Sequence, residues 1–225
     1  MDITMLGTGN AMVTECYNTC FVLRDGDRHL LVDGGGGNTL LAQLKHAEFD
    51  WMDMREIFVT HKHVDHIMGI VWMIRMICQH MKQGQYEGEA TIYGHEEVIR
   101  ILEEMAEMLY PKKQTCYIGD RLHLVVVEDG EERTVMGHKT TFFDIQSTKA
   151  KQFGFCMDMG MVRNSPAAVM SHTTNVRKNT PKTANGSFMK PSVSLTRQTD
   201  STHMRNITPQ LKMPVNWQSS SAYRT

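Results

Sequence analysis

The sequence predicts an α/β fold over residues 1–160, followed by a basic polar tail over residues 161–225. Up to Gly160, short segments with the alternating pattern of strands are mixed with longer segments that have the apolar spacing of helices. After Gly160 neither periodicity continues, and the chain becomes rich in Ser, Thr, Asn, Lys and Pro. That composition is typical of a disordered segment, so we expect the tail to lack a core of its own.

Charge divides the chain at the same point. The tail holds nine Lys and Arg residues and one acidic residue, Asp200, which gives it a net charge of +8. The remaining 15 basic and 24 acidic residues give the first part a net charge of −9. The break therefore indicates two functional parts or two origins for the sequence.

The first part contains nine expected strands and three expected helices. A hairpin is expected where two strand patterns flank Asp25-Gly26-Asp27. The helix at 67–81 has a nearly continuous apolar face, so it is expected to be buried. The strands are expected at 2–6, 19–23, 29–32, 56–60, 90–93, 122–127, 134–136, 140–145 and 153–157, and the other helices at 38–45 and 96–109.

The overall composition is that of a globular protein, with 41% hydrophobic and 22% charged residues. No apolar run approaches the ~20 residues that span a bilayer, and the N-terminus lacks the pattern of a signal peptide. The five cysteines are scattered and form neither a disulfide framework nor a metal-binding pair. We therefore expect a cytoplasmic protein with no membrane partner.

One short segment carries the chemistry. His61-Lys62-His63-Val64-Asp65-His66 follows directly after the apolar strand expected at 56–60. A single histidine is more often a core or surface residue than a ligand, but four such groups in six residues are hard to attribute to chance. Imidazole nitrogens and a carboxylate are the ligands of zinc and similar metals. His61, His63, Asp65 and His66 are therefore the predicted metal ligands.

This segment resembles the HxHxDH signature of the metallo-β-lactamase superfamily, whose fold is an αββα sandwich with the site at the strand ends. Gly7-Thr8-Gly9 and Asp33-Gly34 match the early glycine loop and strand-ending Asp-Gly of that superfamily. The opening LGTGNA and the later KQFGF at 151–155 are most similar to the ribonuclease Z group of phosphodiesterases, over about residues 1–158.

The resemblance implies an αββα fold that binds two zinc ions, with manganese as the alternative metal. It also implies that Asp65 is the general base of a hydrolase. The implied substrate is a phosphodiester, either a small molecule or a nucleic acid, and the resemblance allows a homodimer.

The sequence departs from the ribonuclease Z pattern at several positions. Val64 stands where those proteins usually have glycine, and Gln146 stands where they have a third histidine ligand. His138 is a candidate substitute, although a surface role is the more common one for such a histidine. No Gly/Pro-rich arm for tRNA is present, and a first part with a charge of −9 would repel a polyanion.

The tail lacks the bridging aspartate and terminal histidine that the resemblance requires, and a change of reading frame near Gly160 explains this. If reading starts at the third base of each codon, residues 159–175 can encode a Gly-Asp pair. In the same frame, the codons from Thr202 onward can encode His-His-Ser followed by an amphipathic helix. We therefore expect 1–160 to be an incomplete domain and 161–225 to be out of frame, so full activity is not expected of this chain.

Two other functions remain open at this stage. Gln146 and the missing ligands favour a non-catalytic or inactive protein of the same fold. A domain with a basic RNA-binding tail is the third possibility, but the tail offers only Phe188, Trp217 and Tyr223 for stacking on bases. The leading hypothesis is a dinuclear zinc phosphodiesterase.

Overall fold

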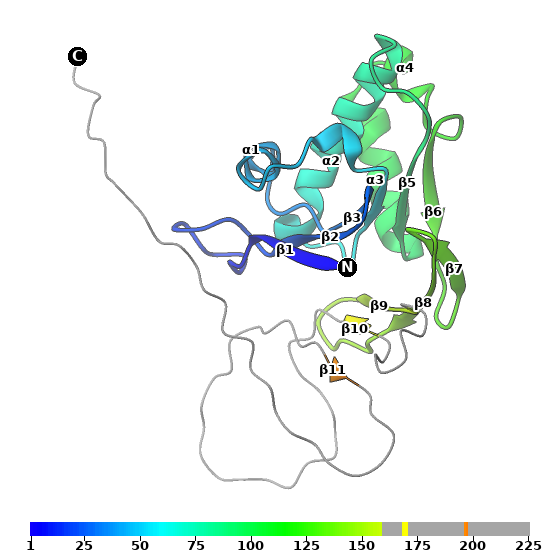
Figure 1. Ribbon diagram of the computed structural model, residues 1–225. Helices are drawn as coiled ribbons and strands as arrows, with labels where there is room; N and C mark the ends of the chain where they lie inside the picture. Colours follow the sequence, from blue (N-terminus) through cyan, green and yellow to red (C-terminus); the bar gives the residue numbers. More distant parts are fainter. Residues whose placement is uncertain (159–167, 171–195, 198–225) are drawn as a thin grey trace, which may run out of the picture.

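The computed structural model describes residues 1–158, 168–170 and 196–197 (Figure 1). The expected disorder of the tail falls almost wholly outside these residues. The two described pieces of the tail are short strands that the sequence did not predict, β10 (Ala168–Met170) and β11 (Thr196–Arg197). Among the described residues, no helix has the length and apolar character needed to cross a membrane.

The described strands form two sheets. The first sheet has the order β1-β2-β3-β4-β5-β6, antiparallel from β1 to β3 and parallel from β3 to β6. The second sheet is antiparallel, with the order β11-β10-β9-β8-β7. The strands not yet given are β1 (Asp2–Gly7), β2 (Cys20–Asp25), β3 (Arg28–Val32), β4 (Glu56–Phe58), β5 (Ala90–Gly94), β6 (Leu122–Val126), β7 (Glu132–Val135), β8 (His138–Asp144) and β9 (Phe153–Met157).

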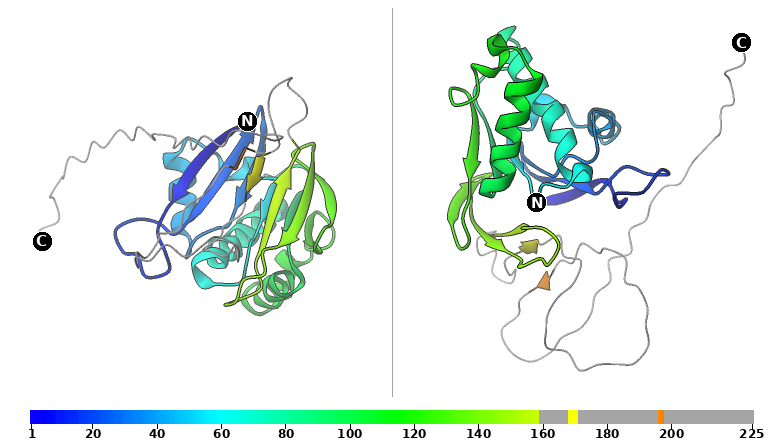
Figure 2. Two further views of the ribbon diagram at one scale, coloured as in Figure 1. Left: turned by 90° about the horizontal axis from the view of Figure 1, so that it is seen from below. Right: turned by 180° about the vertical axis from the view of Figure 1, so that it is seen from behind.

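The helices lie on the face of the first sheet that is turned away from the second sheet (Figure 2). They connect the parallel strands, because a parallel pair requires a crossover that a helix commonly supplies. Each expected helix is present, and two short elements were not predicted, the 3-10 helix η1 and helix α4. The bounds are α1 (Thr39–His46), η1 (Trp51–Asp53), α2 (Val64–Lys82), α3 (Glu96–Leu109) and α4 (Lys112–Thr115).

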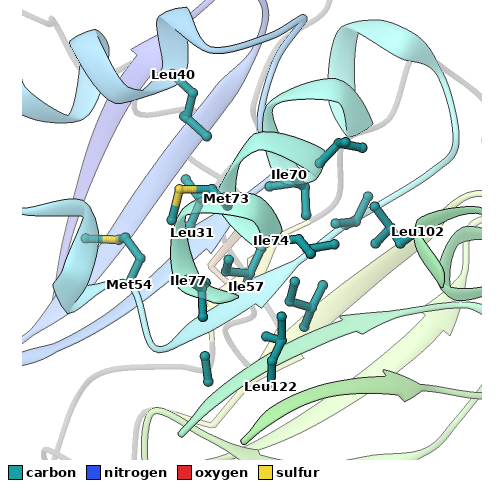
Figure 3. Close-up of a cluster of buried hydrophobic side chains, with 14 of the residues drawn as sticks. Leu31, Leu40, Met54, Ile57, Ile70, Met73, Ile74, Ile77, Leu102 and Leu122 are labelled. Atoms are coloured by element: carbon teal, nitrogen blue, oxygen red, sulfur yellow. The ribbon is translucent and has the colours of Figure 1, made fainter. Parts of the chain in front are cut away.

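Two hydrophobic cores lie on the two faces of the first sheet. Successive side chains of a strand point to opposite faces, so Leu31 and Ile57 pack under the helices while Leu30 and Phe58 face the second sheet. Figure 3 shows the helix-side core, in which α2 covers the middle strands. Between the sheets, the Phe58 ring packs against those of Phe142 and Phe155, with centroids 5.2 and 5.4 Å apart.

The helices, the first sheet and the second sheet form three of the four layers of the expected αββα sandwich. The described residues contain no helix of the fourth layer, which would cover the second sheet. Helix α2 begins at Val64, three residues before the expected start. Asp65 and His66 therefore belong to the first turn of a long helix rather than to the preceding loop. The predicted ligands lie at the junction between β4 and α2.

Candidate metal centre

The predicted ligand segment begins where two neighbouring parallel strands end. The chain leaves β4 at Phe58, and the neighbouring strand β3 ends at Val32, directly before Asp33. The backbone N–H of Asp33 donates to the Phe58 carbonyl at 2.9 Å, so the segments that follow β3 and β4 begin next to each other. His63 then occupies the N-cap position of α2 in an extended conformation, without a capping hydrogen bond from its side chain.

All four predicted ligands line one cavity of about 180 Å³. The rings of His61 and His63 have centroids 4.6 Å apart, and those of His61 and His66 are 4.1 Å apart. The Nε2 atom of His66 lies 3.5 Å from Oδ2 of Asp65. The cavity is also lined by Gly9, Asn10 and Thr19 on one side and by Ser147, Lys149, Ala150 and Gln152 from the β8–β9 loop.

Asp33 is a site residue that the sequence indicated only as part of a strand-ending Asp-Gly, without a role at the site. Its side chain is fully buried, and its backbone adopts a positive φ of 59°. The backbone N–H of Thr60 donates to Oδ1 of Asp33 at 2.8 Å, and Nδ1 of His66 lies 2.8 Å from Oδ2. The strand-ending Asp-Gly was the available signal, but it did not reveal which side chains the carboxylate would reach.

Thr60 completes the set of buried polar groups. Its hydroxyl lies 2.8 and 3.1 Å from the two oxygens of Asp33, and 2.9 Å from Nδ1 of His61. Thr60 and Asp33 are 2% and 0% exposed, so these contacts are shielded from water. The buried Asp33 carboxylate thus contacts His66 directly and shares the Thr60 hydroxyl with His61.

The donor set fits a metal such as zinc. Potential ligand atoms of Asp33, His61 and His66 all lie within 4.8 Å of one another, and all three residues are buried. Nitrogen and carboxylate oxygen are the donors that zinc takes from histidine and aspartate. The chain therefore has a group of residues suited to a metal ion where strands β3 and β4 end.

The electrostatics of His66 reflect its carboxylate neighbours. Burial acts to lower the pKa of this imidazole, but the charge of Asp33, its hydrogen bond and the charge of Asp65 together raise that pKa above the usual value. The charged neighbours therefore outweigh desolvation, as expected where an imidazole lies between two carboxylates.

Neither candidate for the third histidine ligand lies on the cavity. Gln146 is exposed at the start of the β8–β9 loop with a positive φ of 55°, and it is not among the lining residues. His138 lies at the other end of β8, where its Nε2 contacts Oδ2 of Asp25 at 2.7 Å. This contact and the nearby N-terminal ammonium group lower the pKa of Asp25. The suggestion that His138 replaces the missing ligand is therefore wrong for this structure.

Comparison with solved structures identifies the fold. The chain superposes on the metallo-β-lactamase-fold protein YhfI from Bacillus subtilis with a TM-score of 0.56 and 18% identity, covering 74% of this chain and 61% of that one. For the short form of human tRNase Z the TM-score is 0.51 at 20% identity, covering 70% and 64%. The described fold is thus the metallo-β-lactamase fold.

The family follows from the sequence. A family model described as "Anti-Pycsar protein Apyc1" matches residues 1–185, and the chain belongs to that family. The match continues past Gly160, the residue after which the sequence becomes basic and polar.

More distant similarity links the chain to ribonuclease Z proteins. The one from Methanothermobacter thermautotrophicus is 34% identical over 111 residues, which are 49% of this chain and 34% of that protein. The one from Thermococcus sibiricus is 34% identical over 95 residues, 42% and 29% of the two chains. The matched part of this chain thus spans about a third of these relatives or less.

Proposed function

We propose that this protein is a metal-dependent phosphodiesterase that acts on a small phosphodiester. The observation that carries the proposal is the cavity at the β4–α2 junction, where three imidazoles and a carboxylate meet. Membership of the Apyc1 family and partial similarity to ribonuclease Z support this class of reaction. We assign His61, His63, Asp65 and His66 as the metal ligands.

The chemistry divides between the metal and the protein. When bound, zinc would stabilise the charge that develops on the phosphoryl group. In the hydrolysis, the oxygen of a water molecule forms a bond to phosphorus, and the bond from phosphorus to the leaving alcohol oxygen breaks. Asp65, whose side chain is 13% exposed at the cavity, would accept the proton that the water loses. That proton is then available to the leaving alkoxide.

The surroundings of the cavity favour a small anionic substrate. Lys149 is the one Lys or Arg among the described lining residues, and its ammonium group would attract a phosphodiester anion. A volume of about 180 Å³ has room for one phosphodiester group. Residues 1–160 carry a net charge of −9, which opposes the binding of a polyanion. Precursor tRNA is therefore the less favoured substrate.

A second function is favoured by the position of Gln146. The β8–β9 loop has Gln146 where a third histidine ligand is expected, and the neutral amide of Gln146 does not line the cavity. This loop therefore supplies no histidine to the described site. A protein that binds one metal weakly and does not turn over substrate would fit this feature.

The variant Asp65→Asn separates these two functions. With zinc or manganese added, the frame-restored protein should hydrolyse bis(p-nitrophenyl) phosphate, and the 225-residue chain should do so more slowly. In both, Asp65→Asn should lose most of this activity because the amide cannot accept a proton. Asp120→Asn, which removes an exposed carboxylate away from the cavity, is the matched control. Cyclic mononucleotides and a precursor tRNA serve as further substrates.

Equal turnover by wild type and Asp65→Asn would contradict the assignment of the base. Metal binding without turnover of any of these substrates would favour the non-catalytic function.

A further inference from the structure

The hydrogen bonds among Asp33, Thr60, His61 and His66 indicate which atoms carry the protons. An ionised carboxylate can only accept, so the Thr60 hydroxyl, 2.8 Å from Oδ2 of Asp33, must be the donor of that bond. A hydroxyl has a single hydrogen, and this one is directed to Asp33. The contact of 2.9 Å between the same hydroxyl and Nδ1 of His61 therefore requires the imidazole to donate.

The same reasoning applies to His66. Its Nδ1 lies 2.8 Å from Oδ2 of Asp33, and this contact is a hydrogen bond only if the ring nitrogen carries the proton. Neutral His61 and neutral His66 then both have their proton on Nδ1. In both neutral rings the lone pair is then on Nε2, and Nε2 would be the nitrogen that binds a metal.

We propose that Thr60 is a positioning residue that links His61 to Asp33, so that one buried carboxylate sets the tautomers of both histidines. Asp33 acts directly on His66 and through the Thr60 hydroxyl on His61. The inference rests on the proposed function only in taking His61 and His66 as metal ligands.

This arrangement also assigns a role to Asp33, which is close enough to the histidines to be considered a ligand itself. Its oxygens already accept hydrogen bonds from the Thr60 backbone N–H, the Thr60 hydroxyl and Nδ1 of His66. A carboxylate held by three donors at full burial is occupied in orienting its neighbours. Asp33 is therefore a positioning residue, and the metal is held from the cavity side.

The protonation state of the metal-free protein tests the proposal directly. In the full 225-residue chain, long-range ¹H–¹⁵N NMR correlations of the imidazoles should show His61 and His66 with the proton on Nδ1. Thr60→Val keeps the shape of the side chain and removes the hydroxyl, so His61 should move to a mixture of tautomers while His66 keeps its own. Thr60→Ser should restore the wild-type pattern.

Metal affinity provides the second measurement. Loss of an orienting partner commonly weakens binding by 10- to 100-fold, so the Kd of Thr60→Val for Zn²⁺ should rise by about tenfold or more. Thr60→Ser should stay within about threefold of wild type. Thr140→Val removes another fully buried hydroxyl, on β8, and controls for a general loss of stability.

The outcomes are distinct. A proton on Nε2 of His61 in the wild-type protein would overturn the inference without any variant, and so would unchanged tautomers and unchanged Zn²⁺ affinity in Thr60→Val. Absence of Zn²⁺ binding by the wild type would overturn the proposed function instead, and the tautomers would still decide the role of Thr60.

Discussion

His95 is a fully buried imidazole at the N-terminus of α3, in contact with the Phe153 ring at a centroid distance of 5.4 Å. Burial lowers the pKa of His95, and the nearby Lys151 cation lowers it further, against the opposing effects of Glu97 and Asp144. The folded protein thus holds this side chain neutral at pH values where an exposed histidine is already protonated.

Stability should therefore fall as the pH is lowered from the ordinary histidine pKa of 6.5 toward the lower pKa of the folded state. In that interval the unfolded chain binds a proton at His95 and the folded chain does not. The free energy of unfolding then decreases by at most about 1.4 kcal/mol per pH unit from this side chain. Urea unfolding of wild type and His95→Gln between pH 7.5 and 5 measures the difference.

The variant curve should be flatter than the wild-type curve. His46→Gln, which removes an exposed imidazole at the end of α1, is the matched control. Parallel curves for wild type and His95→Gln would show that His95 gains its proton equally in both states.

At the residue scale, the sequence indicated four of the residues that line the cavity but not the hydrogen bonds of Asp33 and Thr60 with two of them. His61, His63, Asp65 and His66 form one short motif, so their spacing alone indicated a shared site. Asp33 lies 27 residues before Thr60, and their contact depends on the pairing of β3 with β4. Spacing in the sequence cannot reveal a hydrogen bond that a sheet creates.

At the scale of elements, the first glycine of the run at 34–37 is explained by packing against α2. A Cβ atom on Gly69 would lie 1.8 Å from the carbonyl oxygen of Gly34, and a Cβ atom on Gly34 would lie 2.6 Å from the Ile70 nitrogen. Two backbone hydrogen bonds join the same segments, from Gly34 to the His66 carbonyl at 2.8 Å and from Gly69 to the Gly35 carbonyl at 3.0 Å. This contact holds the start of α2 against the end of β3.

Gly69→Ala should therefore destabilise the protein. In a helix interior, alanine is more favourable than glycine by about 1 kcal/mol. Here the added methyl group would clash with the Gly34 backbone, and overpacking of this kind costs about 1–3 kcal/mol. The clash would also lie next to the helical turn that carries His66. We expect a net loss that urea unfolding can resolve. Gly37→Ala, where a Cβ atom meets nothing within 4 Å, should change stability by less than about 0.5 kcal/mol. Equal stability of both variants would contradict the packing argument.

The sequence predicted the longer elements well because their patterns are repeated over several residues. Strand β9 and helix α3 have the bounds that apolar spacing indicated. The short elements α4 and η1 have four and three residues, too few for a period to be visible. The start of α2 was placed late because Val64 is β-branched and His63 is not a usual capping residue.

At the scale of the whole molecule, the charge break near Gly160 leads to a prediction about the gene. We expect the nucleotide sequence around this codon to contain a change of frame, and restoration of the frame should supply a bridging aspartate and a terminal histidine. Metal analysis should then show about two ions per chain in the restored protein and no more than about one in this chain. Two tightly held metals in this 225-residue chain would contradict the frame argument.

The two cores differ in when their residues leave the ribosome. The buried residues of the helix-side core run from Leu6 to Leu122, whereas the core between the sheets needs residues as late as Met157. Chains grow at about 5–20 residues per second and tend to fold from the N-terminus, so the helix-side core can assemble seconds before the inter-sheet core is complete. The backbone that carries His61 to His66 would take shape during synthesis, before the β8–β9 loop arrives to close the other side of the cavity.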